Sequence, residues 1–507
     1  GNGAGQRVGD FVPFTDVGTL SQSVAFNAAD EDELRIANSV STSPTNVQKK
    51  TVSCWLKPLN ARENWIACGN GGSDNSERIY SNSTGKLQYL TRNGSSSNAH
   101  VMTTGAFLAD SSQWVHVVFG LDYTSGSTAA DRVKIYVNGV RITDLEEDTY
   151  PADNMTAQAY INKASTEQII GCHPDYHAAA DHSNMYYAEY FMVDGHQLDA
   201  SVFGQLDTST NKWVPKASST VTTAIGALSG GFGNCGFYLD FSNTSDYGED
   251  DSGNNRDWTE GGVLDATNQF SDTPSKNFPT FDPTNNGAGT LSEGNTKIVS
   301  ATNQRTTYTT MPIPATGQWY WEVDAASYAT GGGSYFGVVP ASTPLPTNNP
   351  SSGFTDQVTV ETHSGNSNFY STSNSGTTWC NTPGGNSFLS SGDVLQFAYD
   401  ASVGTLFIGN NNTWYRAGGA RDTFANATTV AGSKMPTGIS RRFLYGRGGS
   451  YAETYLLNFG QVNGTFSGSS TSFDAASDGF FVYTPPTGYK ALNQDNLDDT
   501  ASKITAF

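Results

Sequence analysis

The sequence predicts an all-β protein built from two antiparallel β-sandwiches in tandem. Two tryptophan-containing stretches, 113–139 and 317–410, contain runs of alternating residues with the period of a β-strand. Each stretch also contains an Asn-Gly or Gly-Asn dipeptide, which is the strongest short-range signal for a β-hairpin. A chain of 507 residues is too long for one core, and no run of about 12 residues shows a clean helical period.

The first sandwich is predicted over residues 20–216. Trp55 and Trp114 belong to its alternating patterns and are predicted to be core residues. Glycine, serine, threonine and asparagine between the patterns supply the turns that an antiparallel sheet needs. The expected strands are 23–26, 51–56, 87–90, 115–119, 133–137 and 187–193.

An acidic connector rich in glycine and asparagine is predicted over residues 217–288. Within it, 236–241 alternates like an extra strand, whereas 246–257 is a run of Asp, Asn and Gly typical of turns. The second sandwich is predicted over 289–492, and a polar C-terminal tail over 493–507. The strands expected for the second sandwich include 317–324, 392–400 and 404–410, with Trp319 and Trp321 in the core.

A glycine-rich arm is predicted at residues 1–19, before the first sandwich. Its glycines offer little side chain to bury, so the arm is a poor core builder. Phe11, Val12 and Phe14 could dock together as an apolar plug on a partner. We therefore expect the arm to anchor the protein to a larger particle.

Composition excludes several classes of partner. A net charge of −21 argues against nucleic acid, whose phosphates require clusters of Lys and Arg, and against anionic membrane surfaces. No apolar span of about 20 residues is present, so membrane insertion is not expected. The five cysteines show no CxxC spacing, and the printed sequence shows no signal peptide. Buried free thiols, formed in a reducing cytoplasm, are the expectation.

Several segments carry a resemblance to known families. In the first half they are 23–26, 51–58, 114–118, 132–140, 187–198, 203–204 and 213–216, continued by 236–241 and 251–258. These resemble the laminin-G-like, concanavalin A-like jelly rolls of structural proteins from marine tailed phages. In the second half, 319–323, 335–338, 392–395, 404–406, 458–461 and 488–492 are similar to SPRY domains. The resemblance implies two tandem concanavalin A-like sandwiches and a virion origin. It leaves function open, because these folds host lectins, adhesins, hydrolases and interaction modules.

The glucanase relatives of this fold place two catalytic carboxylates on one face of a strand, in the pattern Glu-x-Asp-x-x-Glu. Glu322 and Asp324 are the nearest match, but Ser327 stands where the second glutamate would be. We interpret the two carboxylates as exposed strand residues. Motifs for an activated serine, a zinc protease or a phosphate loop do not occur. The protein is therefore not expected to be an enzyme.

Three of the seven histidines fall in one loop between two strands of the first sandwich. His173, His177 and His182, with Asp175 and Asp181, could gather a transition metal, which accepts imidazole and carboxylate ligands. The proline and alanines among them favour instead a solvated or subunit-facing loop.

The acidic part of the connector is the candidate calcium site. Its oxygen donors alternate around glycines that permit a tight wrap, as calcium loops require, although the terminal glutamate of an EF-hand is absent. Calcium is also common in laminin-G-like relatives, and no other cofactor is expected. The alternative is a plain soluble connector. The candidate ligands are Asp246, Asp250, Asp251, Asn254 and Asp257.

Carbohydrate binding requires an aromatic face for the CH groups of a sugar, beside amides that bind its hydroxyls. Two loops of the second sandwich offer this combination: Trp379 with Asn381, and Trp414 with Tyr415. The alternative, that Trp379 and Trp414 cap the core, stays open at this stage.

The function expected from the resemblance and the absent catalytic motifs is a phage virion surface protein that binds host glycans without catalysis. It would be a fibre, spike or decoration subunit that contacts other virion proteins and forms a homo-oligomer, a trimer being favoured. Assembly in the host cytoplasm would reconcile reduced cysteines with a place on the virion surface. Two alternatives are a purely structural decoration protein and a polysaccharide-degrading hydrolase.

Overall fold

The fold is described from a computed structural model. The description covers residues 18–499 except 38–39, 41, 73, 95, 127, 209, 301–304, 330–332, 345–357, 363–367, 372–376, 382–388, 416–420, 427–434, 448–450, 463 and 467. For β26 (Asn368–Ser371) and β27 (Thr377–Asn381), only the backbone is described. Phe11, Val12 and Phe14, the expected anchor, lie outside the described residues. No helix in the described part of the chain is long and apolar enough to cross a membrane.

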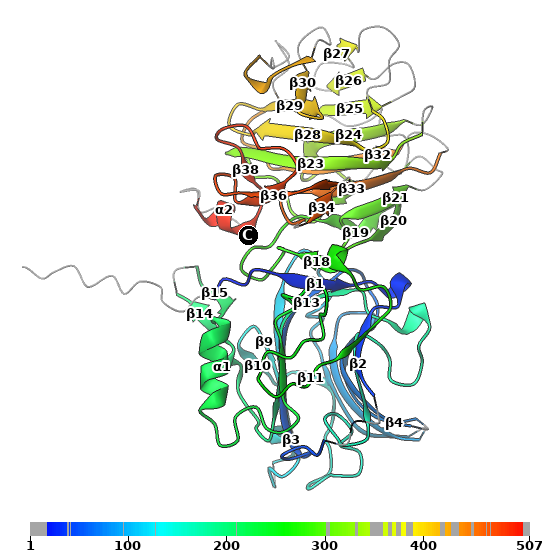
Figure 1. Ribbon diagram of the computed structural model, residues 1–507, viewed down its shortest axis with the longest axis vertical. Helices are drawn as coiled ribbons and strands as arrows, with labels where there is room; N and C mark the ends of the chain where they lie inside the picture. Colours follow the sequence, from blue (N-terminus) through cyan, green and yellow to red (C-terminus); the bar gives the residue numbers. More distant parts are fainter. Residues whose placement is uncertain are drawn as a thin grey trace, which may run out of the picture.

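The chain forms β-sandwiches, as predicted, and the first consists of two antiparallel sheets (Figure 1). Sheet I has the order β10 (Val140–Ile142), β9 (Val133–Val137), β8 (Val115–Asp122), β3 (Lys49–Pro58), β13 (Met185–Asp194), β1 (Ser23–Phe26) and β18 (Gln269–Phe270), and β16 (Phe237–Leu239) also pairs with β13. Sheet II has the order β11 (Leu145–Thr149), β7 (Ser96–Thr103), β6 (Leu87–Asn93), β5 (Asn75–Ser81), β4 (Asn64–Gly72), β12 (Glu167–Ile170), β2 (Glu33–Ile36) and β17 (Thr259–Gly261).

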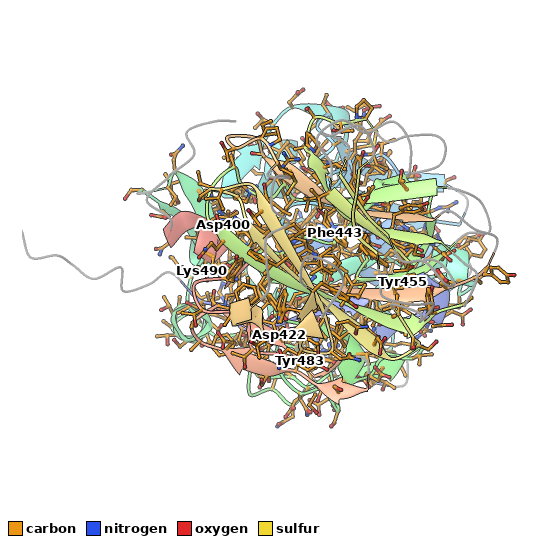
Figure 2. All side chains as sticks on the ribbon, turned by 90° about the horizontal axis from the view of Figure 1, so that it is seen from above. Asp400, Asp422, Phe443, Tyr455, Tyr483 and Lys490 are labelled. Atoms are coloured by element: carbon orange, nitrogen blue, oxygen red, sulfur yellow. The ribbon has the colours of Figure 1, made fainter. Side chains whose placement is uncertain are left out.

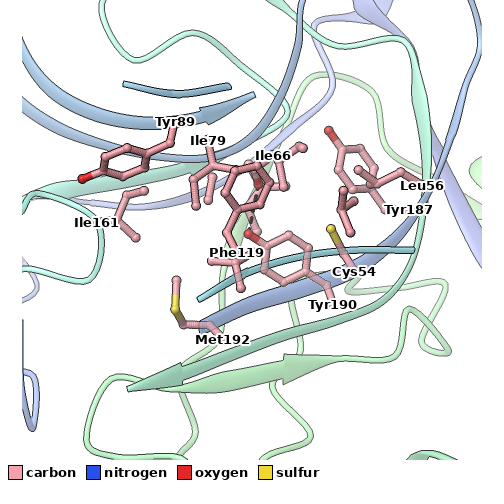
Figure 3. Close-up of a cluster of buried hydrophobic side chains, with 14 of the residues drawn as sticks. Cys54, Leu56, Ile66, Ile79, Tyr89, Phe119, Ile161, Tyr187, Tyr190 and Met192 are labelled. Carbon is pink, nitrogen blue, oxygen red and sulfur yellow. Dashed lines mark hydrogen bonds between the residues drawn. The ribbon is translucent and has the colours of Figure 1, made fainter. Parts of the chain in front are cut away.

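The core of the first sandwich lies between sheets I and II. Alternate side chains of a strand point to opposite faces, so every second residue of each strand enters this core. Figure 3 shows Cys54 and Tyr190 from sheet I among Ile66, Ile79 and Tyr89 from sheet II. All five are at most 1% exposed.

The predicted hairpin turn at Asn138-Gly139 joins β9 to β10. Both residues have positive φ, 45° and 80°, which is the backbone that a tight two-residue hairpin requires. A Cβ atom at Gly139 would lie 2.4 Å from the ring of Trp213, so a side chain there would displace the indole. Trp213 in turn belongs to the hairpin of β14 (Gly204–Asp207) and β15 (Lys212–Pro215).

The outer face of sheet I is covered. Helix α1 (Ser218–Gly226) places Val221 and Ile225 against Phe191 and Val193 of β13, and Figure 1 shows the helix on the side away from β2 and β4. This helix, with β16, β17 and β18, comes from residues predicted as a connector. The segment 217–288 therefore completes the first sandwich through at least β18.

The second sandwich is also two-layered. Sheet III has the order β19 (Phe281–Asn286), β22 (Arg305–Thr309), β32 (Arg441–Arg447), β24 (Ser334–Pro340), β25 (Val358–Thr362), β26 and β27. Sheet IV has the order β20 (Gly289–Ser292), β21 (Lys297–Ser300), β33 (Thr454–Asn458), β23 (Gln318–Ser327), β28 (Asp393–Asp400), β29 (Thr405–Asn410), β30 (Thr413–Tyr415) and β31 (Arg421–Asp422), and β38 (Lys490–Ala491) runs parallel to β23. The hairpins β34 (Thr465–Phe466) with β35 (Ser469–Ser470) and β36 (Ser472–Asp474) with β37 (Gly479–Phe481), and helix α2 (Gln494–Asp499), complete the domain.

The predicted core tryptophans are buried in both sandwiches. Trp55 and Trp114 are 3% and 8% exposed, and Trp319 and Trp321 are 1% and 0% exposed. Trp321 stacks on Phe397 with their ring centroids 5.4 Å apart. The start of the predicted polar tail also belongs to the fold, because two asparagines there, Asn493 and Asn496, are buried.

The two sandwiches meet through buried polar contacts as well as apolar ones. The hydroxyl of Tyr186 donates to the carbonyl oxygen of Gly294 at 2.8 Å, and Nδ2 of Asn295 donates to the carbonyl oxygen of Leu59 at 2.6 Å. Both bonds join residues that belong to different sandwiches. The carbonyl oxygens of Gly294 and Leu59 therefore have side-chain donors at the junction.

The cysteine prediction is confirmed for the residues that the structure describes. Cys54, Cys68, Cys172 and Cys235 are all free and buried. The side chain of Cys380, in β27, lies outside the description.

Candidate functional site

The outer face of sheet II carries polar and aromatic side chains. We call the outward residues of β2, β12, β4, β5, β6 and β7 the open face. Strand alternation puts them there: Ile79 and Tyr89 enter the core, so Arg78, Tyr80 and Arg92 point outward. The sequence analysis did not single out this face.

Aromatic rings form one half of the open face. Trp65 stacks on Tyr80 with ring centroids 4.7 Å apart, and His173 packs against Trp65 in a T-shaped arrangement with ring centroids 4.6 Å apart. Tyr176 continues the series, 4.8 Å from His173. Trp65 and Tyr80 are buried, whereas Tyr176 is 57% exposed. Tyr176 is therefore the ring that an arriving ligand would meet.

Arg78 ties the loop at 171–183 to the open face. Its Nη2 donates to Oδ2 of Asp175 at 2.6 Å, its Nε donates to the hydroxyl of Ser76 at 2.7 Å, and its Nη1 lies 2.9 Å from Nε2 of His173. Burial lowers the pKa of His173 to about 3, with smaller effects from the charges of Arg78 and Arg92. His173 is thus a neutral structural residue at physiological pH.

Arg92 is the cation of the open face that is left without a partner. It pairs in register with Ser76 of β5 and Ser97 of β7, at the end of β6. Its Nε is buried and has no hydrogen bond, and its guanidinium forms no ion pair within the described part of the chain. Burial raises the pKa of Asp175 although Arg78 and Arg92 act to lower it. Arg92 therefore remains available to an anion from outside.

Hydrogen-bonding groups surround Arg92 and the aromatic rings. Oε1 of Gln88 accepts from the hydroxyl of Tyr80 at 3.0 Å and lies 2.8 Å from Nε2 of His100. Ser96, Ser97 and Asn98 are exposed at the start of β7. A guanidinium binds planar oxyanions through two parallel hydrogen bonds. The face can hold a carboxylate-bearing or similarly charged ligand, with an aromatic ring and hydroxyls beside it.

The two carboxylates that most nearly match the glucanase pattern are buried, whereas the sequence predicted them to be exposed. Glu322 and Asp324 are 0% and 2% exposed, so the interpretation as exposed strand residues is wrong. Glu322 accepts from the backbone N–H groups of Val482 at 3.0 Å and Tyr483 at 2.9 Å. Burial raises its pKa to about 7. Glu322 therefore holds β23 to the C-terminal segment and is buried away from solvent.

The predicted calcium ligands shape turns instead. Both oxygens of Asp250 are used by donors: Oδ1 accepts from the N–H groups of Tyr238 and Ser252, each at 2.9 Å, and Oδ2 accepts from the Ser252 hydroxyl and the N–H of Arg256. Asp257 accepts from the N–H of Asp250.

The other residues of the predicted calcium site have similar roles. Asp246 accepts from the N–H of Gly248, while Asn254 donates to the carbonyl oxygens of Gly233 and Gly236. Burial and the neighbouring Asp240 raise the pKa of Asp251 to about 6. Among the residues described, these side chains do not gather around one point. The calcium prediction is therefore not supported.

The predicted sugar-binding loops are corrected in part. Trp414 and Tyr415 lie in β30 and are 2% and 7% exposed, and Trp414 packs edge-on against Phe424 at 4.8 Å. Both residues belong to the core. For Trp414, burial in the core was the alternative to sugar binding that the sequence left open. The side chains of Trp379 and Asn381, in β27, lie outside the described residues.

A polar hollow in the second sandwich offers less than the open face. It is lined by Gly317, Gln318, Trp319, Asp400, Ser402, Gly488 and Lys490, of which Asp400 and Lys490 are labelled in Figure 2. Nε2 of Gln318 donates to Oδ2 of Asp400 at 2.8 Å, and Oδ1 accepts from the N–H of Ser402 at 3.0 Å. Both carboxylate oxygens of Asp400 already accept hydrogen bonds from the protein.

The histidines of the loop 171–183 do not converge on one ion. His173 contacts Arg78, and Nδ1 of His177 lies 3.1 Å from Nη2 of Arg35. His182 instead lies beside Glu33 and Cys172, which the sequence did not connect with it. Asp175 and Asp181, the predicted carboxylate ligands, are not part of that group.

Comparison with known proteins supports the fold of the first sandwich. Residues 30–189 match the laminin G sequence profile described as the concanavalin A-like lectin/glucanases superfamily. This range contains every strand of the open face. No match is found among curated proteins.

Similar solved structures include the heptameric SAP-like pentraxin from Limulus polyphemus, 18% identical over 36% of this chain and 79% of that chain, with a TM-score of 0.26. The SPRY domain of human HERC1 is 15% identical over 35% of this chain and 96% of that chain, with a TM-score of 0.25. Domains LG4-5 of the mouse laminin α1 chain are 10% identical over 86% of this chain and 88% of that chain, with a TM-score of 0.28. None of these likenesses assigns a ligand to this chain.

Proposed function

We propose that this protein binds acidic glycans without catalysis, through the open face of its first sandwich. The observation that carries the proposal is Arg92, a partly buried guanidinium with no partner in the described part of the chain. Arg92 is half-buried, so the outer N–H groups of its guanidinium can donate to an anionic ligand. A uronate, sialate or sulfate group would supply oxygens in the planar or tripodal arrangement that a guanidinium recognises.

The neighbouring side chains suit the rest of a sugar. The exposed ring of Tyr176 would face the CH groups of a pyranose, and His100 and the exposed serines of β7 would bind hydroxyls. A charge of −21 opposes the approach of an anionic polymer over long distances. Salt screens that repulsion beyond a Debye length of about 8 Å near physiological ionic strength, whereas a contact with Arg92 acts at shorter range.

The setting that we propose is the surface of a phage particle, where the protein would be a fibre, spike or decoration subunit. Four buried free cysteines support folding in a reducing cytoplasm before release. Contacts with other virion proteins and a homo-oligomer, most simply a trimer, belong to the same proposal. Several copies on one particle would raise weak single-site affinity through avidity.

A glycan array tests the proposed function. The purified chain should bind acidic glycans and ignore their neutral counterparts of equal length. Binding should weaken as salt is raised, because a charged contact carries it. Uniform silence would support a structural decoration protein instead, and the appearance of new reducing ends would support a hydrolase.

A further inference from the structure

A cluster of three metal-ligating side chains lies at one edge of sheet II. Glu33 begins β2, Cys172 follows β12, and His182 follows the short helix η3 (Ala179–Asp181). One ligand atom of each lies within 4.8 Å of the other two, and all three residues are buried. Among the described residues, this is the one group of three or more His, Cys, Asp or Glu side chains whose ligand atoms are close enough to hold a metal ion.

Glu33 presents an unsatisfied oxygen to this cluster. Its Oε1 accepts from Nε and Nη2 of Arg35, at 3.0 and 2.6 Å. Its Oε2 is buried and has no hydrogen bond, and Nε2 of His182 lies 3.5 Å away, too far for a normal one. Glu33 is 9% exposed, so water does not readily replace the missing donor. A buried carboxylate oxygen without a donor suits a cation.

His182 is oriented to offer a lone pair. Its Nδ1 lies 3.0 Å from the carbonyl oxygen of Ala178, so Nδ1 carries the proton and donates it. In the neutral ring, Nε2 is then unprotonated and faces Glu33 and Cys172. A histidine whose other nitrogen donates to a backbone carbonyl is the usual arrangement in protein metal sites.

We propose that Glu33, Cys172 and His182 bind a divalent transition metal of the zinc class. Thiolate, imidazole and carboxylate are the ligands that this class takes, and bond lengths of about 2.0–2.3 Å in a tetrahedron place ligand atoms about 3.3–3.6 Å apart. The Oε2 to Nε2 separation of 3.5 Å lies in that range. His177 lies beside the proposed site, with its Nδ1 3.6 Å from Sγ of Cys172.

The charges around the site balance when the ion is present. Glu33, Glu167 and a Cys172 thiolate contribute three negative charges, and Arg35, which is paired with both glutamates, contributes one positive charge. A divalent cation supplies the remaining two. Without it, Cys172 stays a protonated thiol whose Sγ lies 3.4 Å from the carbonyl oxygen of Tyr176.

The proposed metal would fix the loop at 171–183 to the start of β2. The same loop carries Asp175 and Tyr176, which belong to the proposed ligand-binding face. A structural ion here would add a second link between this loop and sheet II, beside the contacts of Arg78 with His173 and Asp175. The metal proposal does not depend on the glycan proposal, since its ligands are different residues.

Metal content and cobalt spectroscopy of the full chain test the site. Chain purified under reducing conditions without chelator should contain about one zinc ion. After chelation, Co²⁺ should restore a tetrahedral visible spectrum with a thiolate charge-transfer band, because Cys172 supplies the only sulfur ligand. Zinc should raise the melting temperature of the parent chain.

Three variants and a control complete the test. Cys172→Ser should remove the charge-transfer band, and His182→Gln and Glu33→Gln should weaken zinc binding at least tenfold. Cys235→Ser changes another buried free cysteine outside the cluster and should behave like the parent. Circular dichroism will identify any variant that fails to fold, in which case the remaining variants decide. A parent chain that takes up no stoichiometric metal, or a Cys172→Ser variant that binds as well as the parent, would overturn the proposal.

Discussion

Nζ of Lys57 lies 2.7 Å from Oδ2 of Asp272, and both side chains are fully buried where the two sandwiches meet. The other oxygen of Asp272 accepts from Nε1 of Trp114 at 2.8 Å. Lys57 also donates to Oδ1 of Asn277 and to the carbonyl oxygen of Phe278. This network fixes β3 to the chain segment that leads into the second sandwich.

Lys57→Met should destabilise the protein strongly, because it leaves the carboxylate of Asp272 buried without its cation. We expect a loss of about 3–5 kcal/mol in the free energy of unfolding. Lys49→Met is the matched control, since Lys49 pairs with Asp122 at the surface and should cost at most about 1 kcal/mol. Urea unfolding of both variants measures the difference. Equal, small losses would show that Lys57 and Asp272 do not form a buried pair.

Stability should fall as pH rises, and Glu189 should cause part of the fall. Burial raises the pKa of Glu189 to about 7, above its ordinary value of 4.5, while the hydroxyls of Tyr238 and Ser218 donate to it. The folded state therefore keeps a proton that the unfolded state releases. The stabilisation is complete below pH 4.5 and is lost as pH rises to 7, by at most about 3 kcal/mol.

Glu189→Gln should remove this dependence, because an amide keeps one oxygen for both hydroxyls and does not titrate. In unfolding free energies measured between pH 5 and 8, the parent should lose stability relative to the variant as the pH rises. Glu322, whose pKa is also raised to about 7, is unchanged in both proteins and cancels in the comparison. A constant difference across this range would mean that Glu189 is ionised in the folded state throughout.

Trp414→Ala should unfold the second sandwich at lower denaturant concentration, with a loss of about 3–5 kcal/mol, because it removes a buried indole. Tyr176→Ala is the contrasting change, since Tyr176 is exposed and should alter stability by about 0.5 kcal/mol or less. Denaturant unfolding of the two variants checks both values. A Trp414→Ala variant as stable as the parent would show that the side chain of Trp414 is exposed rather than buried.

Local sequence patterns were sufficient to predict the sandwiches and the turn at Asn138-Gly139, whereas the predicted Gly409-Asn410 turn lies in β29 and the chain turns at Asn411 and Asn412. The Asn138-Gly139 dipeptide requires positive φ at both positions, and alternation fixes which face of a strand enters the core. Trp321 was predicted to be buried for that reason and is. Burial of Trp414 was undecided, because β30 has three residues and so shows no alternation to read.

The open face was missed because its residues come from strands that are far apart in the sequence. Arg78 meets Asp175 across 97 positions, and no local pattern indicates that Arg92 lacks such a partner. The alternation Arg78, Tyr80 in β5 and Gln88, Leu90, Arg92 in β6 was the available signal. The acidic run at 246–257 was predicted to bind calcium, but its carboxylates accept hydrogen bonds within turns. Carboxylates that cap turns and carboxylates that bind calcium have the same spacing in a sequence.

Isothermal titration of an acidic glycan against the parent and Arg92→Met tests the central claim most directly. Arg141→Met, on β10 of sheet I, is the control, because Arg141 is a surface arginine remote from the open face. Charge-assisted hydrogen bonds contribute about 1.5–3 kcal/mol, so Arg92→Met should weaken binding roughly tenfold to a hundredfold while Arg141→Met binds like the parent. The affinity for the neutral counterpart of the glycan should be the same for the parent, Arg92→Met and Arg141→Met. Equal affinity of Arg92→Met and the parent for the acidic glycan would contradict binding at the open face.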